Sequence, residues 1–303
     1  MIMKKIILFG TLCISFITRS MAQDPSLKDM QKAVSKEVKS LPDSLNGWKK
    51  GGSFILNLNQ GHLSNWVAGG EQNTIGVNAL INYAINYRQD KNTWDNYFDI
   101  ALGIQNATSY TKFRKTDDRF DFTSKYGRQV SKKWYAAGLF NFNTQMLPGY
   151  AYSATGATKI SNLFTPGKIL LSLGMDFRPN DNFSVFISPI TTRWLLKLDN
   201  DFKDINLFGV PAGKKSYNEI GAYLSARYNK PLNAWATYTG RLDLFSNYKR
   251  KPQNVDVLMN NLLVMKYNKW FGSSISVDLL YDDDILSKTQ LKEIFGLGLT
   301  LAL

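Results

Sequence analysis

The sequence predicts an all-β protein, a transmembrane antiparallel β-barrel of about 12 strands. Three observations indicate this fold class. From Gly52 onward, apolar side chains recur at every second position, which is the side-chain period of a β-strand. Polar and charged residues fill the alternate positions in strand after strand, as expected where one face meets lipid and the other a polar lumen. Aromatic residues make up 13% of the chain, which suits the aromatic girdles of a membrane barrel.

Residues 1–22 are predicted to form a secretory signal peptide. Lys4 and Lys5 precede an apolar run at positions 6–17, and the S-M-A sequence at positions 20–22 has the pattern of a cleavage site. The only cysteine, Cys13, lies in this segment, so we expect a mature chain without disulfides.

Residues 23–50 carry a different pattern and are predicted to form a short periplasmic amphipathic helix. Leu27, Met30 and Val34 recur at three- and four-residue intervals among lysines, and Pro42 ends the run. A position folded into the mouth of the barrel is the open alternative for this helix. The barrel itself is expected to span residues 51–303.

The barrel strands are expected at regular intervals along this second segment. Their predicted ranges are 53–59, 75–87, 94–104, 120–129, 134–144, 169–177, 183–188, 220–228, 234–245, 255–265, 271–281 and 291–303. The last range alternates large apolar residues with small ones. A strand of this kind at an open edge invites aggregation, so we expect it to pair with the first strand and close the barrel.

The predicted connections alternate between short and long. The short ones, rich in Asn, Asp, Lys and Pro, lie near residues 88–92, 130–133, 179–182, 229–233 and 267–270. The long ones lie near residues 60–73, 106–118, 146–166, 194–216, 246–254 and 282–290. This alternation is typical of short periplasmic turns and longer outer loops.

The charge of the chain indicates its surroundings. The formal net charge is +13. An exported chain of this charge is expected to meet anionic headgroups of outer-membrane lipid and lipopolysaccharide, or anionic solutes, rather than nucleic acid. The sequence predicts no cofactor.

Charged residues at the inward positions of the predicted strands are candidate lumen residues. They are Asp99, Lys125, Lys168, Asp176, Glu219, Arg227, Arg241, Asp243, Asp256 and Asp278. One interpretation is an interior held together by paired charges, because buried charges need partners. The other is a narrow polar pathway through the barrel. The near balance of the two signs favours the first interpretation.

A short motif around the only histidine offers a weak candidate catalytic site. The H-L-S-N sequence at positions 62–65 is similar to the active-site motif of outer-membrane phospholipase A. A histidine can activate a serine nucleophile, so His62 and Ser64, with Asn65, are candidates for lipid hydrolysis. Trp66 replaces the glycine that continues that motif, and its second, arginine-bearing motif is absent. A polar loop histidine is the alternative.

Other candidates lie in the predicted outer loops. Two acidic runs are weak candidates for a calcium site, although solvated acidic loops are the favoured interpretation: Asp117 with Asp118, and Asp282 with Asp283 and Asp284. Three aromatic residues are candidate contacts for other envelope proteins: Trp66, Trp194 and Phe208.

Several short motifs recur along the chain. They include L-S-N-W-x-x-G-G-E from Leu63, K-T-D-D from Lys115, S-K-Y-G from Ser124, Y-D-D-D from Tyr281 and F-G-x-G-L from Phe295. From about Trp48 to the C-terminus, this set resembles the family known as domain of unknown function 3078. The resemblance implies an outer-membrane β-barrel of Gram-negative bacteria without an assigned activity.

The predicted function is therefore a non-enzymatic channel, transport or ligand-binding barrel in the outer membrane. Two alternatives stay open. One is a structural or accessory barrel that partners other envelope proteins, and the other is the lipid hydrolase.

Overall fold

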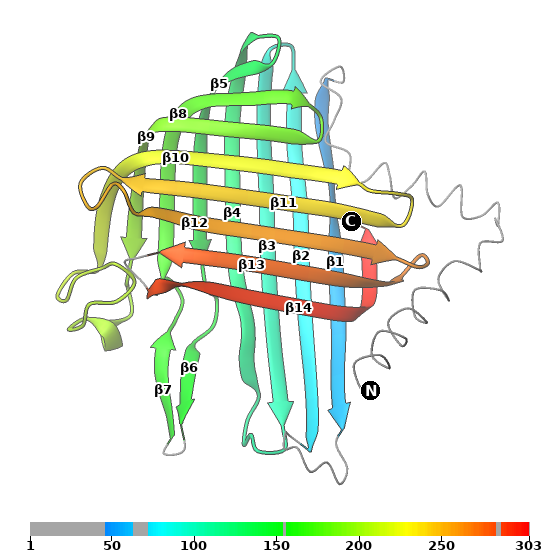
Figure 1. Cartoon of the computed structure of the whole chain (residues 1–303), viewed down its shortest axis with the longest axis vertical. Helices are drawn as coiled ribbons and strands as arrows, with labels where there is room; N and C mark the ends of the chain where they lie inside the picture. The colour runs from blue at the N-terminus through cyan, green and yellow to red at the C-terminus, as the bar shows by residue number, and fades with distance from the viewer. Residues whose placement is uncertain (1–45, 63–71, 154–155, 283–285, 303) are drawn as a thin grey trace, which may run out of the picture.

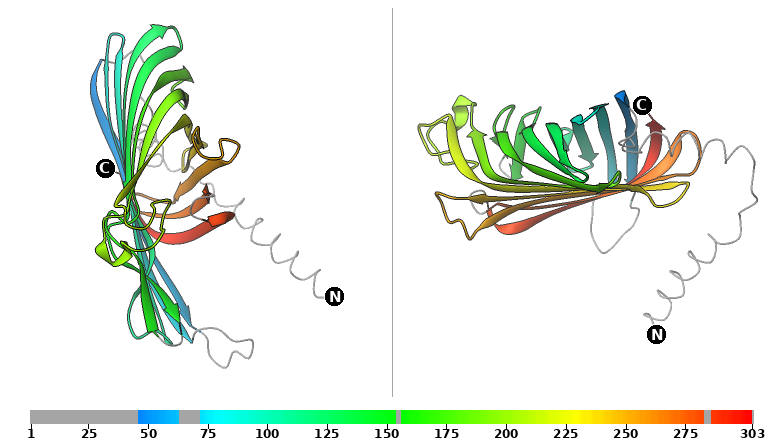
Figure 2. Two further views of the ribbon diagram at one scale, coloured as in Figure 1. Left: turned by 90° about the vertical axis from the view of Figure 1, so that its left-hand side faces the viewer. Right: turned by 90° about the horizontal axis from the view of Figure 1, so that it is seen from above.

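The computed structural model describes residues 46–62, 72–153, 156–282 and 286–302. Within these residues, twelve strands form a closed antiparallel barrel. In Figures 1 and 2, β10–β14 run across one side of the barrel, and β2–β5 form much of the opposite wall. The all-β class and the predicted number of strands are therefore confirmed. In the described part of the chain, no helix is long and apolar enough to cross a lipid bilayer.

The barrel strands follow one another around the ring in chain order. They are β1 (Gly47–His62), β2 (Asn73–Gln89), β3 (Asn92–Ala107), β4 (Arg114–Ser131), β5 (Trp134–Thr144), β8 (Gly167–Asn180), β9 (Phe183–Leu196), β10 (Ser216–Pro231), β11 (Ala236–Asn247), β12 (Val255–Lys266), β13 (Phe271–Asp282) and β14 (Leu286–Ala302). A separate two-stranded sheet, β6 (Gly149–Ser153) with β7 (Gly156–Ser161), stands between β5 and β8. A short 3-10 helix, η1 (Asn200–Phe202), lies between β9 and β10.

The alternation in the sequence explains which side chains face outward. In β14, Leu297 is 46% exposed and Leu299 is 40% exposed, whereas Thr300 between the leucines is 1% exposed. Successive side chains of a strand point to opposite faces of the sheet. The leucines of the last strand therefore cover the outside of the barrel, and its small residues face the interior.

The first and last strands close the barrel as predicted. β1 pairs with β14 from Ser53 opposite Ala302 to Asn57 opposite Gly298. A Cβ atom at Gly298 would lie 1.9 Å from the carbonyl oxygen of Leu56, so only glycine allows this close approach. Closure leaves neither strand with an open edge.

The five predicted short connections all join neighbouring strands at one end of the barrel, which we call the short-turn end. Asparagine side chains stabilise two of them. The Oδ1 of Asn233 accepts hydrogen bonds from the backbone N–H groups of Trp235 and Ala236, and Asn268 does the same for Trp270 and Phe271. The opposite end, which we call the long-loop end, carries the longer connections.

Several strands extend beyond their predicted bounds. The first strand begins at Gly47, inside the segment that was assigned to a helix, because the alternation already holds at Trp48, which pairs with Tyr87 of β2. The remainder of the predicted helix and the predicted signal peptide lie outside the described residues. The β6–β7 hairpin was not predicted, since residues 146–166 were assigned to one long loop.

Apolar side chains fill part of the barrel interior. Ile55, Leu80 and Ala101 of β1–β3 pack together, and Leu262 and Val264 of β12 pack against them from the opposite wall. A second cluster lines the wall from β5 to β11 and consists of Ala137, Leu139, Leu170, Phe186, Tyr223 and Phe245. The rest of the interior is left to polar side chains.

Candidate functional site in the barrel interior

The inward-facing side chains surround a cavity of about 1010 Å³. Its wall includes Asn182 and Trp235 at the short-turn end and Gln145 and Phe208 at the long-loop end. One cavity is therefore lined by residues from both ends of the barrel.

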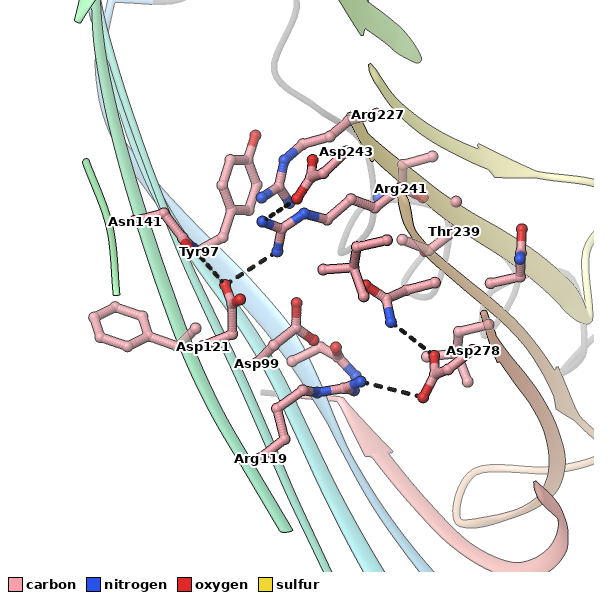
Figure 3. A pocket seen from close by; sticks show the side chains of 18 of the residues that line it. Tyr97, Asp99, Arg119, Asp121, Asn141, Arg227, Thr239, Arg241, Asp243 and Asp278 are labelled. Atoms are coloured by element: carbon pink, nitrogen blue, oxygen red, sulfur yellow. Dashed lines mark hydrogen bonds and ion pairs between the residues drawn. The ribbon is translucent and has the colours of Figure 1, made fainter. Parts of the chain in front are cut away.

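The centre of the cavity is crossed by an ion pair between opposite walls (Figure 3). Arg241 of β11 places Nη1 3.0 Å from Oδ1 of Asp121 on β4, and its Nη2 lies 2.6 Å from Oδ2 of Asp243. Asn141 donates a further hydrogen bond of 2.9 Å to Oδ1 of Asp121. Buried charges need such partners, because each loses its hydration on leaving water.

A second bridge crosses the barrel closer to its last strands. Asp278 of β13 lies 3.3 Å from Arg119 of β4 and 3.0 Å from Lys292 of β14. Asn260 donates a 2.8 Å hydrogen bond to the same carboxylate, and Lys292 also reaches Asp117 at 2.9 Å. These contacts join β4 to strands on the far side of the ring.

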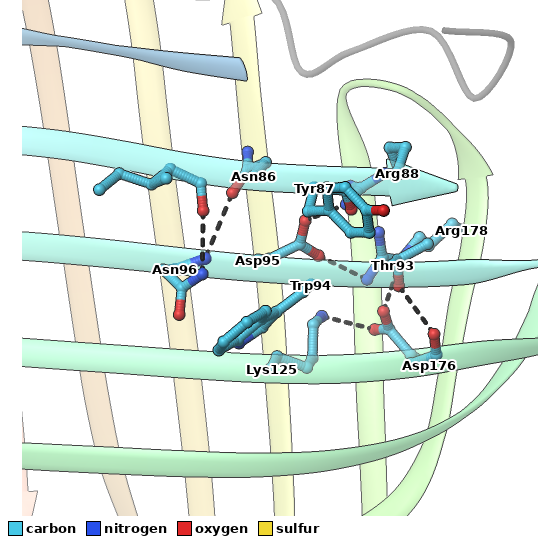
Figure 4. Close-up of polar contacts among 12 residues, drawn as sticks. Asn86, Tyr87, Arg88, Thr93, Trp94, Asp95, Asn96, Lys125, Asp176 and Arg178 are labelled. Carbon is cyan, nitrogen blue, oxygen red and sulfur yellow. Dashed lines mark hydrogen bonds and ion pairs between the residues drawn. The ribbon is translucent and has the colours of Figure 1, made fainter. Parts of the chain in front are cut away.

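A network of five charged side chains lies towards the short-turn end (Figure 4). Asp95 pairs with Arg88 at 2.5 Å and with Arg178 at 2.6 Å. Asp176 accepts from Arg178 at 2.6 Å and from Lys125 at 2.8 Å. All five side chains are buried. The network ties β2, β3, β4 and β8 together.

A corresponding network lies towards the long-loop end. Arg193 of β9 places Nε 2.5 Å from Oε2 of Glu219 and Nη1 2.7 Å from Oδ2 of Asp256. Lys168 of β8 reaches Asp282 of β13 at 3.2 Å. Ion pairs therefore brace the interior at both ends and at the centre.

The β6–β7 hairpin is tied to the loop after β9 by a charged cluster. Lys159 contacts Asp199 and lies 2.9 Å from Asp201, and Asn162 donates a 2.7 Å hydrogen bond to Asp199. Hydrogen bonds to Asp199 and Asp201 raise the pKa of Lys159 to about 12. The hydrogen bond from Lys159, followed by those from the Asp201 backbone and Asn162, lowers the pKa of Asp199 to about 2.

The ten predicted lumen residues all lie in the interior. Seven of them line the cavity: Asp99, Lys168, Arg227, Arg241, Asp243, Asp256 and Asp278. The other three are buried in the ion pairs described above: Lys125, Asp176 and Glu219. The paired interior and the polar cavity, posed as alternatives by the sequence, coexist in one barrel.

Four interior arginines were missed as site residues, and Arg193 shows why. Ser188 and Thr191 are both buried at 1% exposure, whereas Ile187 and Ile190 between and beside them are exposed. The inward parity therefore changes from even to odd numbers at Pro189, where the β8–β9 register shifts. Strict alternation cannot find an arginine beyond such a bulge. The other three are Arg88, Arg119 and Arg178.

The candidate catalytic histidine lies at the end of β1, outside the cavity wall. Its Nδ1 lies 2.6 Å from Oδ1 of Asn73, and both side chains are exposed. Ser64, Asn65 and Trp66 lie outside the described residues. The structure therefore gives no geometry for a His62–Ser64 pair.

Several loop assignments were wrong. Asp117 and Asp118 belong to β4, where they pair with Lys292 and, at 2.8 Å, with Lys115. Their strand continues the alternation into a stretch whose polar composition had indicated a loop.

The remaining metal and contact candidates are distributed differently from the prediction. Asp282 ends β13 and pairs with Lys168, while Asp283 and Asp284 lie outside the described residues. No group of three or more His, Cys, Asp or Glu able to hold a metal occurs in the described ranges. Trp194 is a strand residue of β9 rather than a loop residue, whereas Phe208 does lie in a loop and lines the cavity.

The fold and its interior define a closed β-barrel with a polar, charge-paired lumen. Residues 58–150 match the model of the family described as "Protein of unknown function (DUF3078)". This part of the chain belongs to that family, as its motifs predict.

Among solved structures, three similar barrels illustrate the fold. The translocator domain of autotransporter NalP from Neisseria meningitidis is 10% identical, with 90% of this chain and 94% of that chain covered and a TM-score of 0.38. The COG4313 outer membrane channel from Pseudomonas putida F1 is 10% identical, with 88% and 97% covered and a TM-score of 0.38. A mutant of the TodX monoaromatic hydrocarbon channel is 9% identical, with 78% and 75% covered and a TM-score of 0.31. No curated protein sequence matches the chain.

Proposed function

We propose that the protein is an outer-membrane channel through which small polar solutes cross along the barrel interior. The observation that carries this proposal is the cavity of about 1010 Å³, whose wall includes residues from both ends of the barrel. A barrel of twelve strands lies between the eight that side chains fill and the sixteen or more of open aqueous porins. A narrow, selective pathway fits this intermediate size.

The outer surface supports a membrane location. Large apolar side chains are exposed on the outside of successive strands, among them Leu173 at 66% and Ile190 at 66%. Contiguous exposed apolar surface of this extent is unfavourable in water and favourable against lipid. Lipid and lipopolysaccharide are the proposed surroundings of this face.

Aromatic residues gather near the short-turn end. Trp48 lies 4.9 Å from Tyr87 and 5.7 Å from Trp94 between ring centroids, and Trp134 lies 4.9 Å from Phe177. Such girdles occupy the interface between hydrocarbon and water. We assign the short-turn end to the periplasm, with the signal peptide at residues 1–22 directing export.

The ion pairs across the interior limit the size of the solute. The Arg241–Asp121 and Arg119–Asp278 bridges both cross the cavity. A solute must pass beside these bridges, so we expect small polar molecules to permeate and long oligomers to be excluded.

Planar-bilayer recording tests the proposal. The purified, folded barrel should give discrete conductance steps, and its gel mobility before and after heating should establish folding independently. Arg241→Met removes a cross-barrel bridge and should enlarge the unit conductance, whereas Asp204→Asn in the exposed outer loop should leave it unchanged. A folded barrel that stays silent would refute the channel. Recovery of a crosslinked envelope partner would then support the accessory-barrel alternative.

A further inference from the structure

Two pairs of like charges face each other across the centre of the barrel. Pairing of β3 with β4 places Asp99 directly opposite Asp121. Pairing of β10 with β11 places Arg227 directly opposite Arg241. Like charges directly opposite on neighbouring strands are destabilising unless other groups neutralise them. The two acids and two arginines could neutralise one another as two ion pairs.

Only one of these two ion pairs forms. Arg241 binds Asp121 at 3.0 Å, as described above. Asp99 has no hydrogen-bond or ion-pair partner among the described residues. Arg227 has no carboxylate partner there either: its Nη2 donates to Oγ1 of Thr123 at 3.2 Å, and its guanidinium carbon lies 4.5 Å from the centre of the Tyr97 ring. Most other charged groups of the cavity wall are ion-paired.

Both unpaired groups are open to the cavity. Asp99 and Arg227 line it, and none of their polar atoms is among the described buried atoms that lack a partner. A guanidinium has five N–H donors, and Arg227 uses one of them. Its remaining donors are therefore available to a carboxylate in the cavity, and the Asp99 carboxylate is available to a cation.

The spacing of the two groups follows from the strand register. The Arg227 head group contacts Tyr97 and Thr123, which are opposite each other on β3 and β4. The next inward-facing pair along these strands is Asp99 with Asp121. Two residues of a strand span about 7 Å. The unpaired cation and the unpaired anion therefore lie about one such step apart, as Figure 3 illustrates.

We propose that Asp99 and Arg227 together bind a small zwitterion, such as a free α-amino acid, during its passage. The ammonium group binds Asp99 and completes the neutralisation of the Asp99–Asp121 pair. The carboxylate binds the guanidinium of Arg227, for which a planar two-oxygen acceptor is the matching geometry. This inference rests on the proposed channel function and assigns it a substrate class.

A zwitterion fits this centre better than a simple ion. A free anion at Arg227 would lie next to the uncompensated carboxylate of Asp99, and a free cation at Asp99 would lie next to Arg227. A solute that carries both charges on neighbouring atoms meets an opposite charge at each end, which is the basis of electrostatic complementarity.

Current block in planar bilayers tests the site, with alanine as the zwitterion. Acetate, methylammonium and glycerol serve as the anion, the cation and the neutral solute. Alanine should block the wild-type current at a concentration about tenfold or more below that of each comparison solute, because charge-assisted hydrogen bonds are the strong ones. Asp99→Asn and Arg227→Met should each abolish this advantage. Asp204→Asn, in the outer loop, should retain it.

Equilibrium dialysis of labelled alanine against the detergent-solubilised barrel separates the site from the channel. Binding that both variants lose, in a barrel that does not conduct, would support the site and refute the channel. A conducting wild-type barrel in which alanine blocks no better than glycerol would refute the site and leave the channel. Unchanged alanine binding in the folded Asp99→Asn and Arg227→Met variants would also refute it.

Discussion

Replacement of Asp176 by Asn tests the buried network near the short-turn end. The Asp176 side chain is fully buried, and its carboxylate accepts from Lys125 at 2.8 Å and from Arg178 at 2.6 Å. The neutral amide keeps the size of the side chain but removes its charge. Asp95 would then be the one acid left to three buried cations of this network.

The expected cost follows from the burial of the partners. Removal of one partner from a buried ion pair costs about 3–5 kcal/mol, because the remaining charge stays desolvated without compensation. We expect Asp176→Asn to lower the free energy of unfolding by this amount. Addition of Lys125→Met should recover a large part of the loss, since the double variant removes the uncompensated ammonium as well.

Urea or guanidinium unfolding of the barrel in lipid vesicles, followed by tryptophan fluorescence, measures both changes. Asp204→Asn is the matched control, because the Asp204 side chain is 81% exposed and the same substitution there should change stability by less than about 0.5 kcal/mol. A loss below about 1 kcal/mol for Asp176→Asn, or a double variant no more stable than the single one, would refute the reasoning.

Three further perturbations test other parts of the structure. Gly298→Ala should lower the yield of folded barrel in refolding assays, because its Cβ would meet the backbone of β1; Gly138→Ala, whose Cβ would make ordinary contacts at 3.5 Å and beyond, should refold like the wild type. Leu173→Arg on the outer wall should destabilise the barrel in vesicles by about 2–4 kcal/mol if its side chain faces the middle of the bilayer, and an unchanged stability would contradict the lipid-facing assignment. The contact of Lys159 with Asp199 should persist from about pH 4 to about pH 10, because the lowered pKa of Asp199 keeps its charge until the pH falls through about 2 and the raised pKa of Lys159 keeps its charge until the pH rises through about 12. NMR titration of the two side chains checks this range, and an Asp199 pKa near 4 would contradict it.

Much of the barrel is predictable because strand patterns depend on local sequence. The alternation of Phe98 with Asp99 is enough to assign one side chain to the outside and the other to the interior. The asparagines of the short turns similarly act on neighbouring backbone groups, as Asn233 does. These features need no knowledge of distant parts of the chain.

The pairing within the interior is different, because it depends on how the whole sheet curves and closes. Arg119 and Asp278 are separated by 159 residues along the chain. Their contact requires the registers of all intervening strand pairs, and one bulge such as that at Pro189 changes the inward parity of every later residue in its strand. Alternation therefore predicts which residues face the interior, but not which of them meet.

The partial pairing at the centre has a consequence for how such a barrel stays both stable and permeable. Complete pairing of Asp99 and Asp121 with the two facing arginines would add a second bridge beside Arg241–Asp121 and narrow the cavity. An interior without bridges would leave several charges desolvated and uncompensated. The observed arrangement compensates most charges with fixed partners and leaves one acid and one base to the cavity. The same two residues that weaken the empty barrel are then the ones that a zwitterionic solute stabilises, so binding and passage draw on one electrostatic imbalance.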